Sequence, residues 1–146
     1  MSGTPLDVRP TDRPRLPPGQ TRTDRWPVLH YGRPARAEAP DWSLFVRGRV
    51  EAPLELGWEE LMEVGQREVL CDIHCVTGWS RLDVRFTGVP LAEVVRRARP
   101  RDGAAHVLVH ATDGWTTNLP LEVVLRDGVV AAHAHAGEPL SAEHGG

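Results

Sequence analysis

Lysine is absent from this chain of 146 residues, and all 17 of its basic residues are arginine. A lineage or codon bias accounts for such a pattern; the functional alternative is anion binding, because a guanidinium group suits phosphate and other oxyanions. The formal net charge is -3. A chain without excess positive charge does not resemble proteins that bind nucleic acid or membrane surfaces. We therefore expect no nucleic-acid partner and no membrane partner.

Long apolar runs are also absent, and none approaches the roughly 20 residues that cross a bilayer. Residues 1–24 contain neither an apolar core nor a twin-arginine pair, so they do not resemble a secretory signal. The two cysteines, Cys71 and Cys75, are too few for a disulfide framework. These features predict a cytoplasmic protein with free thiols.

Several familiar motifs are missing from the sequence as well. It contains no G-x-G-x-x-G, P-loop, H-E-x-x-H or G-x-S-x-G sequence. Nucleotide binding through the usual motifs and serine hydrolysis therefore find no support.

The composition changes along the chain. Residues 1–25 are rich in proline and arginine and predict an extended, poorly ordered tail. From residue 26 to residue 146 apolar residues recur with the periods of strands and helices, which predicts one globular domain. Strands are expected within 42–50, 68–74, 106–111 and 129–135, helices at 57–64, 90–98 and 120–125, and turns at 113–114, 127–128 and 137–139. This order predicts an α+β fold of mixed sheets and short helices.

Cys75 stands at the end of an apolar run and before a turn that contains Gly78. A thiolate in such a place is a soft metal ligand whose reactivity follows its pKa. A lone cysteine is more often a small buried hydrophobe, so both interpretations stand at this point. The neighbouring His74 need not touch Cys75, because adjacent side chains of a strand point to opposite faces.

A second metal interpretation uses four residues. Cys71 and Cys75 are four apart, and His133 and His135 share one face of a predicted strand. Together they would supply the four ligands of a zinc site, although structural zinc sites usually contain closer cysteine pairs. A solvated strand face is the alternative for the two histidines.

Other polar residues fall in segments that could line a pocket. His30 and Tyr31 lie in an extended segment and offer hydrogen bonds to a polar ligand. Trp115 and Thr116 follow the Asp113-Gly114 turn, where side chains often contact ligands. Ordinary packing explains each of these pairs equally well.

Several short segments occur together in one order. The most informative reads Asp-Ile-His-Cys-Val-Thr-Gly-Trp-Ser at 72–80 and is followed by Gly-Val-Pro-Leu at 88–91; the others lie at 16–20, 26–32, 58–61, 113–121, 137–140 and 144–146. The ordered set resembles the sulfite-oxidase-like branch of the molybdopterin-binding oxidoreductases over residues 16–146.

This resemblance implies an α+β domain that binds one molybdenum–molybdopterin cofactor and transfers an oxygen atom. Cys75 matches the cysteine that binds molybdenum, and Trp115 matches the turn near the reacting centre, so both are predicted catalytic residues. The predicted cofactor-binding residues are His30, Tyr31, Cys75, Thr116 and His144. Because no haem motif is present, a separate electron-transfer protein is expected.

The match departs from sulfite oxidases in two places. Their early segment reads Arg-Asn-His, whereas this chain has Val28-Leu29-His30, and their arginine after the cysteine is replaced by Ser80. We therefore expect a small oxyanion or sulfoxide-type substrate other than sulfite. Relatives continue beyond the last motif with a segment that binds the cofactor phosphate. We expect residues 26–146 to be the N-terminal part of such a domain, incomplete at its C-terminus and poor at retaining cofactor. The alternative is a non-catalytic fragment or a small zinc-binding module.

Overall fold

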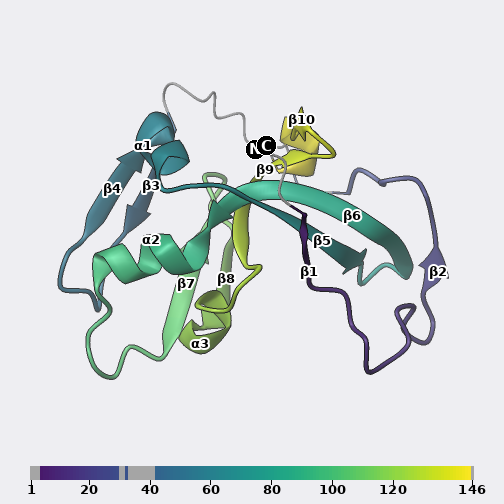
Figure 1. Ribbon diagram of the computed structural model, residues 1–146, viewed down its shortest axis with the longest axis horizontal. Coiled ribbons are helices and arrows are strands. Elements are labelled where there is room, and N and C mark those ends of the chain that lie inside the picture. Colours follow the sequence, from purple (N-terminus) through teal and green to yellow (C-terminus); the bar gives the residue numbers. More distant parts are fainter. Residues whose placement is uncertain (1–3, 30–31, 33–41, 146) are drawn as a thin grey trace.

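A curved ribbon of two antiparallel strands arches across the molecule (Figure 1). The computed structural model describes residues 4–29, 32 and 42–145. The ribbon consists of β5 (Arg67–His74) and β6 (Trp79–Pro90), and it is the centre of a six-stranded sheet in the order β1–β5–β6–β9–β10, with β2 pairing along β6. The other strands of this sheet are β1 (Leu6–Asp7), β2 (Thr21–Arg22), β9 (Val130–His135) and β10 (Glu138–Pro139).

In the described residues, two antiparallel strand pairs and four short helical segments accompany this sheet. The pairs are β3 (Ser43–Val46) with β4 (Leu54–Gly57), and β7 (His106–His110) with β8 (Thr116–Pro120). The helices are α1 (Trp58–Glu63), α2 (Leu91–Ala98) and α3 (Leu121–Val124), followed by the 3₁₀ turn η2 (Ala142–His144). In Figure 1 the β3–β4 pair, α1 and α2 lie at one end of the ribbon and β2 at the other. The arrangement confirms the α+β fold expected from the sequence.

The main hydrophobic core lies where the ribbon meets α1, α2 and the β3–β4 pair. Leu61, Val89 and Val94 are its buried centre. The partly buried residues packed against them are Trp42, Leu44, Val46, Leu56, Met62 and Val64. Burying a valine or leucine side chain contributes roughly 1.5–3 kcal/mol. This core therefore fixes one end of the ribbon and leaves its hairpin end to be held by other contacts.

Two irregularities bend the central sheet. The register between β5 and β6 shifts between Cys71 and Ile73, where Asp83 has a left-handed backbone with φ of 60°. Between β6 and β9 it shifts again at Gly88. A Cβ atom on Gly88 would lie 2.5 Å from the Ala131 carbonyl oxygen, so only glycine allows the two backbones to approach this closely. Bulges of this kind increase the twist of a strand pair and curve it.

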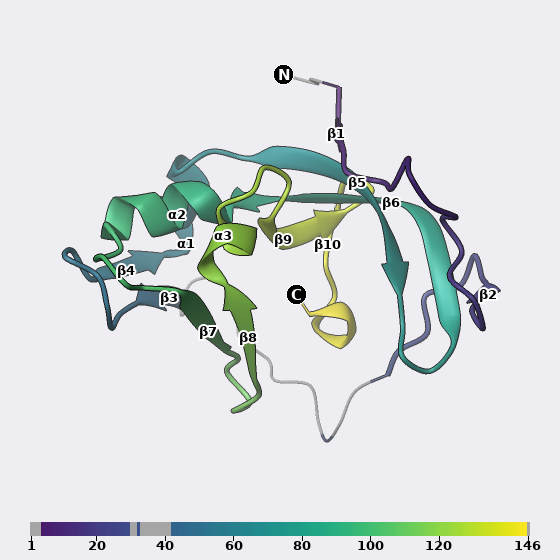
Figure 2. The same cartoon turned by 90° about the horizontal axis from the view of Figure 1, so that it is seen from below.

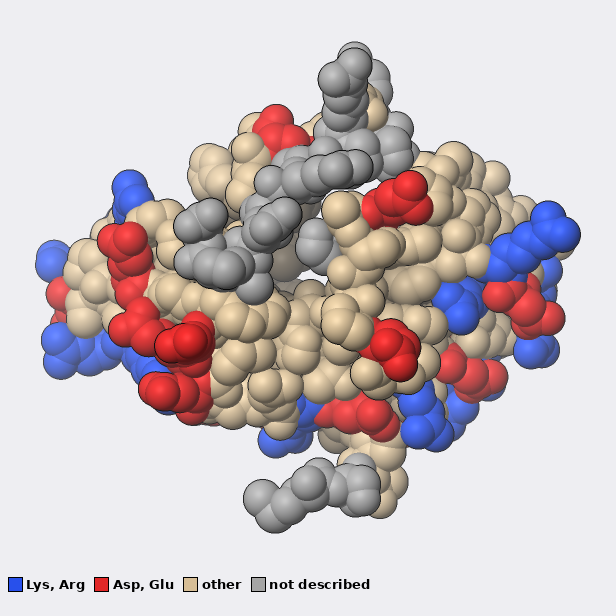
Figure 3. Space-filling model, turned by 90° about the horizontal axis from the view of Figure 1, so that it is seen from above, with Lys and Arg blue, Asp and Glu red and all other residues tan. Residues whose placement is uncertain are grey.

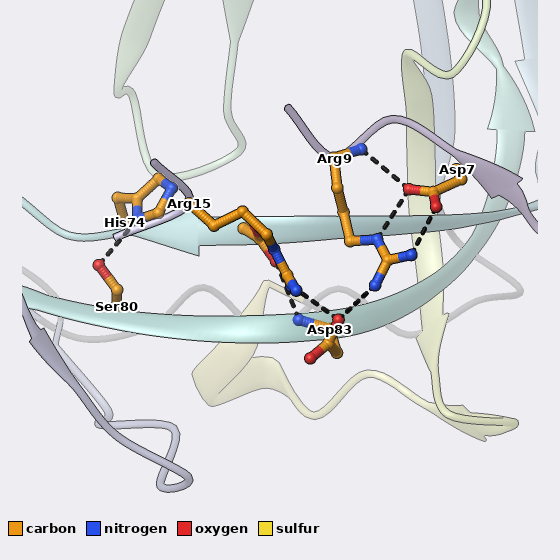
Figure 4. A network of polar contacts seen from close by, with 7 residues as sticks. Asp7, Arg9, Arg15, His74, Ser80 and Asp83 are labelled. Carbon is orange, nitrogen blue, oxygen red and sulfur yellow. Dashed lines mark hydrogen bonds and ion pairs between the residues drawn. The ribbon is translucent and has the colours of Figure 1, made fainter. Parts of the chain in front are cut away.

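The N-terminal segment is bound to the ribbon by strand pairing and by ion pairs. Strand β1 runs parallel to β5, and β2 runs parallel to β6. Arg15 forms a two-pronged contact with Asp72, from Nε at 2.8 Å and from a terminal nitrogen at 2.6 Å. Arg9 and Arg15 both reach Asp83, at 2.6 and 2.7 Å (Figure 4). Composition alone does not reveal that these arginines have carboxylate partners.

The carboxylate of Asp72 is the most enclosed member of this network, with its side chain 1% exposed. It also accepts the Asp83 backbone N–H at 3.0 Å, at the register shift. The hydrogen bonds from Arg15 hold the pKa of Asp72 below its usual range. A buried carboxylate thus joins the N-terminal segment to the bend of the ribbon.

Most of the predicted elements appear in the structure. The helices predicted at 57–64, 90–98 and 120–125 correspond to α1, α2 and α3, and the four predicted strands to β3, β5, β7 and β9. The sequence did not predict six of the strands, namely β1, β2, β4, β6, β8 and β10. Within the described residues, no helix has the length and apolar character needed to cross a membrane.

We predict that Asp72→Asn lowers the thermal unfolding midpoint by roughly 5–10 °C at pH 7, because it removes the buried charged partner of the Arg15 guanidinium and leaves it only the exposed Asp83. Since the folded-state pKa of Asp72 is depressed, its contribution is present above the ordinary carboxyl pKa and is lost as the pH falls through the lower folded value. The gap between wild type and variant should therefore narrow as the pH falls below about 4.

The matched control is Glu93→Gln, which removes an exposed ion pair with Arg96. Exposed pairs contribute little, so this variant should unfold within about 2 °C of wild type. Equal midpoints for Asp72→Asn and wild type in thermal melts at pH 7 would contradict the assigned role of Asp72.

Candidate functional site

Cys75 occupies the first position of the turn that joins β5 to β6. Its N–H donates to the Trp79 carbonyl at 2.9 Å, and its carbonyl accepts the Gly78 N–H at 3.0 Å. Gly78 has φ of 94°, a conformation that favours glycine. The turn follows directly from the sequence, because a four-residue connection ending in glycine closes two antiparallel strands compactly.

Cys75 is half-buried, and its thiol accepts hydrogen bonds from its own turn. The Thr77 hydroxyl lies 3.1 Å from Cys75 Sγ. This bond, together with the Thr77 backbone N–H, lowers the pKa of the Cys75 thiol. Cys71 differs, because burial and the nearby Asp72 raise the pKa of its thiol. The structure thus distinguishes one thiol that favours the charged form from one that disfavours it.

The turn is also bound from the N-terminal segment. The Gln20 side-chain amide donates to the Cys75 carbonyl at 3.0 Å and accepts the Ser80 hydroxyl at 3.0 Å. Ser80 is fully buried, and its oxygen lies 2.7 Å from His74 Nδ1. Because the Ser80 hydrogen is used by Gln20, His74 Nδ1 must be the donor in that last contact. His74 therefore bonds to Ser80, and no contact between His74 and the Cys75 thiol is found in the described part of the chain.

A cavity of about 770 Å³ lies beside Cys75, in the volume range of small-molecule and cofactor sites. Four of the five tryptophans line it, namely Trp26, Trp42, Trp58 and Trp79. Its wall also includes α1, the Ala131–His133 part of β9 and the C-terminal segment. Figure 2 shows this C-terminal segment between the β7–β8 hairpin and the curled end of the ribbon. In Figure 3, the described residues at the lower border of the hollow in the middle of the face are neither Lys or Arg nor Asp or Glu.

Two of the residues that line this largely aromatic cavity, Trp79 and His133, carry polar groups. The indole N–H of Trp79 is buried and has no hydrogen-bond partner among the described residues. His133 lies at the β9 side of the bulge, with Nε2 2.9 Å from Gln66 Oε1, and its burial lowers its pKa. A neutral imidazole and an unused indole N–H are groups that can bind a polar ligand.

His144 also lines the cavity, and both of its ring nitrogens have protein partners. Nδ1 lies 3.1 Å from the Ser141 hydroxyl, and Nε2 lies 3.3 Å from the Trp26 carbonyl. Its ring stacks at a tilt on Trp26, with centroids 4.3 Å apart. His144 therefore packs Trp26 into the cavity wall.

The other predicted site residues lie elsewhere. Trp115 and Thr116 line a separate, shallow pocket of about 300 Å³, and the Trp115 side chain is largely exposed. Asp113 contributes to both pockets and accepts the Trp115 backbone N–H at 3.1 Å. His30 and Tyr31 lie outside the described residues. Cys75 and His144 thus line one cavity, and Trp115 and Thr116 line the shallow pocket next to it.

The four-residue zinc site is not formed. In the described ranges, no three His, Cys, Asp or Glu side chains come together as a metal site. Cys71, Cys75, His133 and His135 are among the residues covered by that finding.

Sequence reasoning missed several residues that shape the site. Gln20, Thr77 and Trp79 were assigned no role, although Thr77 and Trp79 stand inside the cysteine motif itself. Thr77 follows Cys75 by two residues, a spacing at which hydroxyls often bond back to the chain. Gln20 gave no such signal, because its partners are 55 and 60 residues away.

Comparisons with known proteins agree with this geometry. The uncharacterized oxidoreductase YuiH of Bacillus subtilis (strain 168) is 44% identical over 132 residues, which are 90% of this chain and 67% of YuiH. MsrP of Xanthomonas campestris pv. campestris, the catalytic subunit of a protein-methionine-sulfoxide reductase, is 39% identical over 67 residues, 45% of this chain and 20% of MsrP.

The fold is similar to a solved structure as well. The sulfane dehydrogenase SoxCD from Paracoccus pantotrophus superposes with a TM-score of 0.69 at 20% identity, over 79% of this chain and 34% of that chain. This chain therefore spans about two thirds of YuiH and about a third of the SoxCD chain.

The family model of the oxidoreductase molybdopterin binding domain matches residues 30–146, which include the cysteine turn and most of the cavity wall. The chain therefore belongs to the family of oxidoreductases that contain this molybdopterin-binding domain.

Proposed function

We propose that the cavity beside Cys75 binds a molybdenum–molybdopterin cofactor and that the Cys75 thiolate is the protein ligand of the metal. The observation that carries the proposal is the position of this one thiol, with its charged form stabilised, in the wall of a large aromatic cavity in a chain of this family. A soft, anionic sulfur is a suitable ligand for such a metal.

The residues around the cavity fit this cofactor. A volume of about 770 Å³ accommodates a tricyclic heterocycle, and the tryptophan side chains offer flat apolar faces against which it can stack. One of these tryptophans, Trp79, has a buried N–H without a hydrogen-bond partner among the described residues. When bound, the cofactor supplies two-electron oxygen-atom transfer, while the protein supplies the binding site and its electrostatics.

The roles of the remaining predicted residues follow from their positions. His144, with both nitrogens engaged, contributes by fixing Trp26 in the wall. Trp115 and Thr116 would reach a ligand that extends past Asp113, and their roles stay predictions. A cytoplasmic location and a separate electron-transfer protein also stay predictions.

We further propose a neutral sulfoxide-type substrate. Among the described residues that line the cavity none is cationic, whereas Asp113 and Glu143 are acidic. A site edged by carboxylates repels an oxyanion such as sulfite and leaves a neutral sulfoxide unaffected. The name of the MsrP relative, a protein-methionine-sulfoxide reductase, supports the same substrate class.

We predict that Cys75→Ser lowers the molybdenum content by at least about tenfold, because the hydroxyl replaces the soft anionic ligand. The matched control is Cys71→Ser, which changes the other cysteine of the same hairpin and should keep its molybdenum. The measurement is elemental analysis of the full chain purified from a molybdenum-replete host. Equal molybdenum in wild type and Cys75→Ser would refute the ligand assignment.

The same analysis tests the alternatives. Stoichiometric zinc in place of molybdenum would indicate a zinc-binding module. Protein without either metal would support a non-catalytic fragment. Zinc contradicts the proposed function, whereas protein without metal is also expected of a chain that retains cofactor poorly.

A second prediction concerns thiol reactivity in cofactor-free protein. The thiolate is the reactive form, so the lowered pKa of Cys75 should let iodoacetamide modify it at lower pH than Cys71, whose pKa is raised. Thr77→Val removes the hydroxyl donor and should move the Cys75 alkylation profile to higher pH. Mass spectrometry of alkylated peptides separates the two sites. A profile unchanged by Thr77→Val would disprove the role given to the hydroxyl.

A third prediction concerns the substrate. Two equivalents of reduced viologen dye supply two electrons, which with two protons convert a sulfoxide to a sulfide and water. We expect the molybdenum-loaded protein to oxidise the dye with methionine sulfoxide or dimethyl sulfoxide, and to show at least about tenfold lower kcat/KM for sulfite oxidation with a dye acceptor. Faster turnover of sulfite than of either sulfoxide would overturn the substrate assignment.

A further inference from the structure

Residues 15–23, here called the strap, lie alongside the end of the ribbon where β5 turns into β6. The Thr21 N–H donates to the Gly78 carbonyl at 2.8 Å, and the Thr23 N–H donates to the Ser80 carbonyl at 2.9 Å. Upstream, Arg15 is ion-paired with the buried Asp72. The strap is therefore bound at the bend of the ribbon and again at the cysteine turn.

Gln20 is the strap residue that reaches the turn through its side chain. Its amide nitrogen donates to the Cys75 carbonyl at 3.0 Å, and its amide oxygen accepts the Ser80 hydroxyl at 3.0 Å. The two bonds use opposite ends of one planar amide, so they fix the Cys75 peptide relative to the start of β6. Gln20 also precedes residue 30, where the match to the family model begins.

The hydrogen bonds of Ser80 and His74 determine which way the Gln20 side-chain amide faces. Ser80 is fully buried and has a single hydrogen, which it donates to Gln20, while His74 Nδ1 donates to the Ser80 oxygen. His74 and Ser80 are paired across the ribbon at the last step before the turn (Figure 4). A fully paired polar network of this kind rigidifies the backbone that it contacts.

We propose that Gln20 is a positioning residue for Cys75, holding the peptide of the cysteine so that its thiol points into the cavity. The expected effect of Gln20 on the metal rests on the proposed function, because Gln20 acts there only through Cys75, the proposed metal ligand. Residues that orient a metal ligand typically contribute 10–100-fold in metal affinity or activity.

The test compares three variants of the full chain. Gln20→Leu removes both side-chain bonds, whereas Gln20→Glu keeps an acceptor for Ser80 and removes the donor to the Cys75 carbonyl. Thr21→Ala is the matched control, because the exposed Thr21 pairs with β6 through its backbone, which the substitution leaves in place. The first readout is amide hydrogen exchange of Gly78 in cofactor-free protein, and the second is the rate of molybdenum release together with the thiolate-to-metal absorption of loaded protein.

We expect Gln20→Leu and Gln20→Glu to speed Gly78 exchange and molybdenum release roughly tenfold or more, and to shift the absorption band. Exchange of the α2 amides should be unchanged in both variants, and Thr21→Ala should match wild type throughout. Wild-type Gly78 exchange, or a wild-type release rate and band, in Gln20→Leu would overturn the inference.

The failure of this inference and that of the proposed function are distinguishable. If Cys75→Ser retains molybdenum, the ligand assignment fails, whereas the Gly78 exchange of cofactor-free Gln20→Leu still reports whether Gln20 holds the turn. If Cys75→Ser loses molybdenum and Gln20→Leu keeps wild-type exchange and release, only the positioning role is wrong.

Discussion

The antiparallel pairing of β5 with β6 is the constraint on which the rest of the structure depends. One end of this ribbon enters the hydrophobic core through Val89, and the other end carries Cys75. Between them the register shift at Asp72 and Asp83 bends the strands. A buried carboxylate is unfavourable unless it is paired, and Arg15 supplies the pair through two charge-assisted hydrogen bonds. The bend is therefore tied to a residue of the N-terminal segment, far away in the sequence.

Sequence patterns predict the helices and strands that depend on residues close together in the chain. Helix α2 buries Ala92, Val94, Val95 and Ala98, and its spacing of three and four residues is visible in the sequence. Strand β6 was missed for a physical reason. Asp83 interrupts the pattern at the bulge, and Gly88 and Pro90 are residues usually typical of turns and helix starts, whereas here Gly88 allows close approach to β9. Strand β8 was missed because its first three residues, Thr116 to Asn118, are polar and exposed and show no apolar alternation.

The candidate site also contains one part that the sequence predicts and another that only the fold reveals. Cys75 could be identified from its own motif, and its turn is explained by Gly78 and Thr77, which are neighbours in sequence. The cavity and the Gln20 contact could not be identified, since they depend on strands, helices and the strap coming together in space. The zinc hypothesis used residue type and spacing alone, and it failed because the bend of the ribbon and the pairing of β9 bring no three of these ligand types together within the described ranges. Trp115 was assigned to the reacting centre by resemblance, and the structure puts it at the adjacent shallow pocket.

The way in which the Cys75 thiolate is stabilised bears on the chemistry of the cavity. Its charge is favoured by a hydroxyl and a backbone N–H of Thr77, which are dipoles, and no cation contributes among the causes of its lowered pKa. Dipoles leave the negative charge uncompensated, whereas a cation would neutralise it. With Asp113 and Glu143 at the edge of the same cavity, the described walls present negative charge to an incoming molecule. The proposed metal binding through the thiolate and the proposed preference for neutral over anionic substrates would both follow from this pattern of charge.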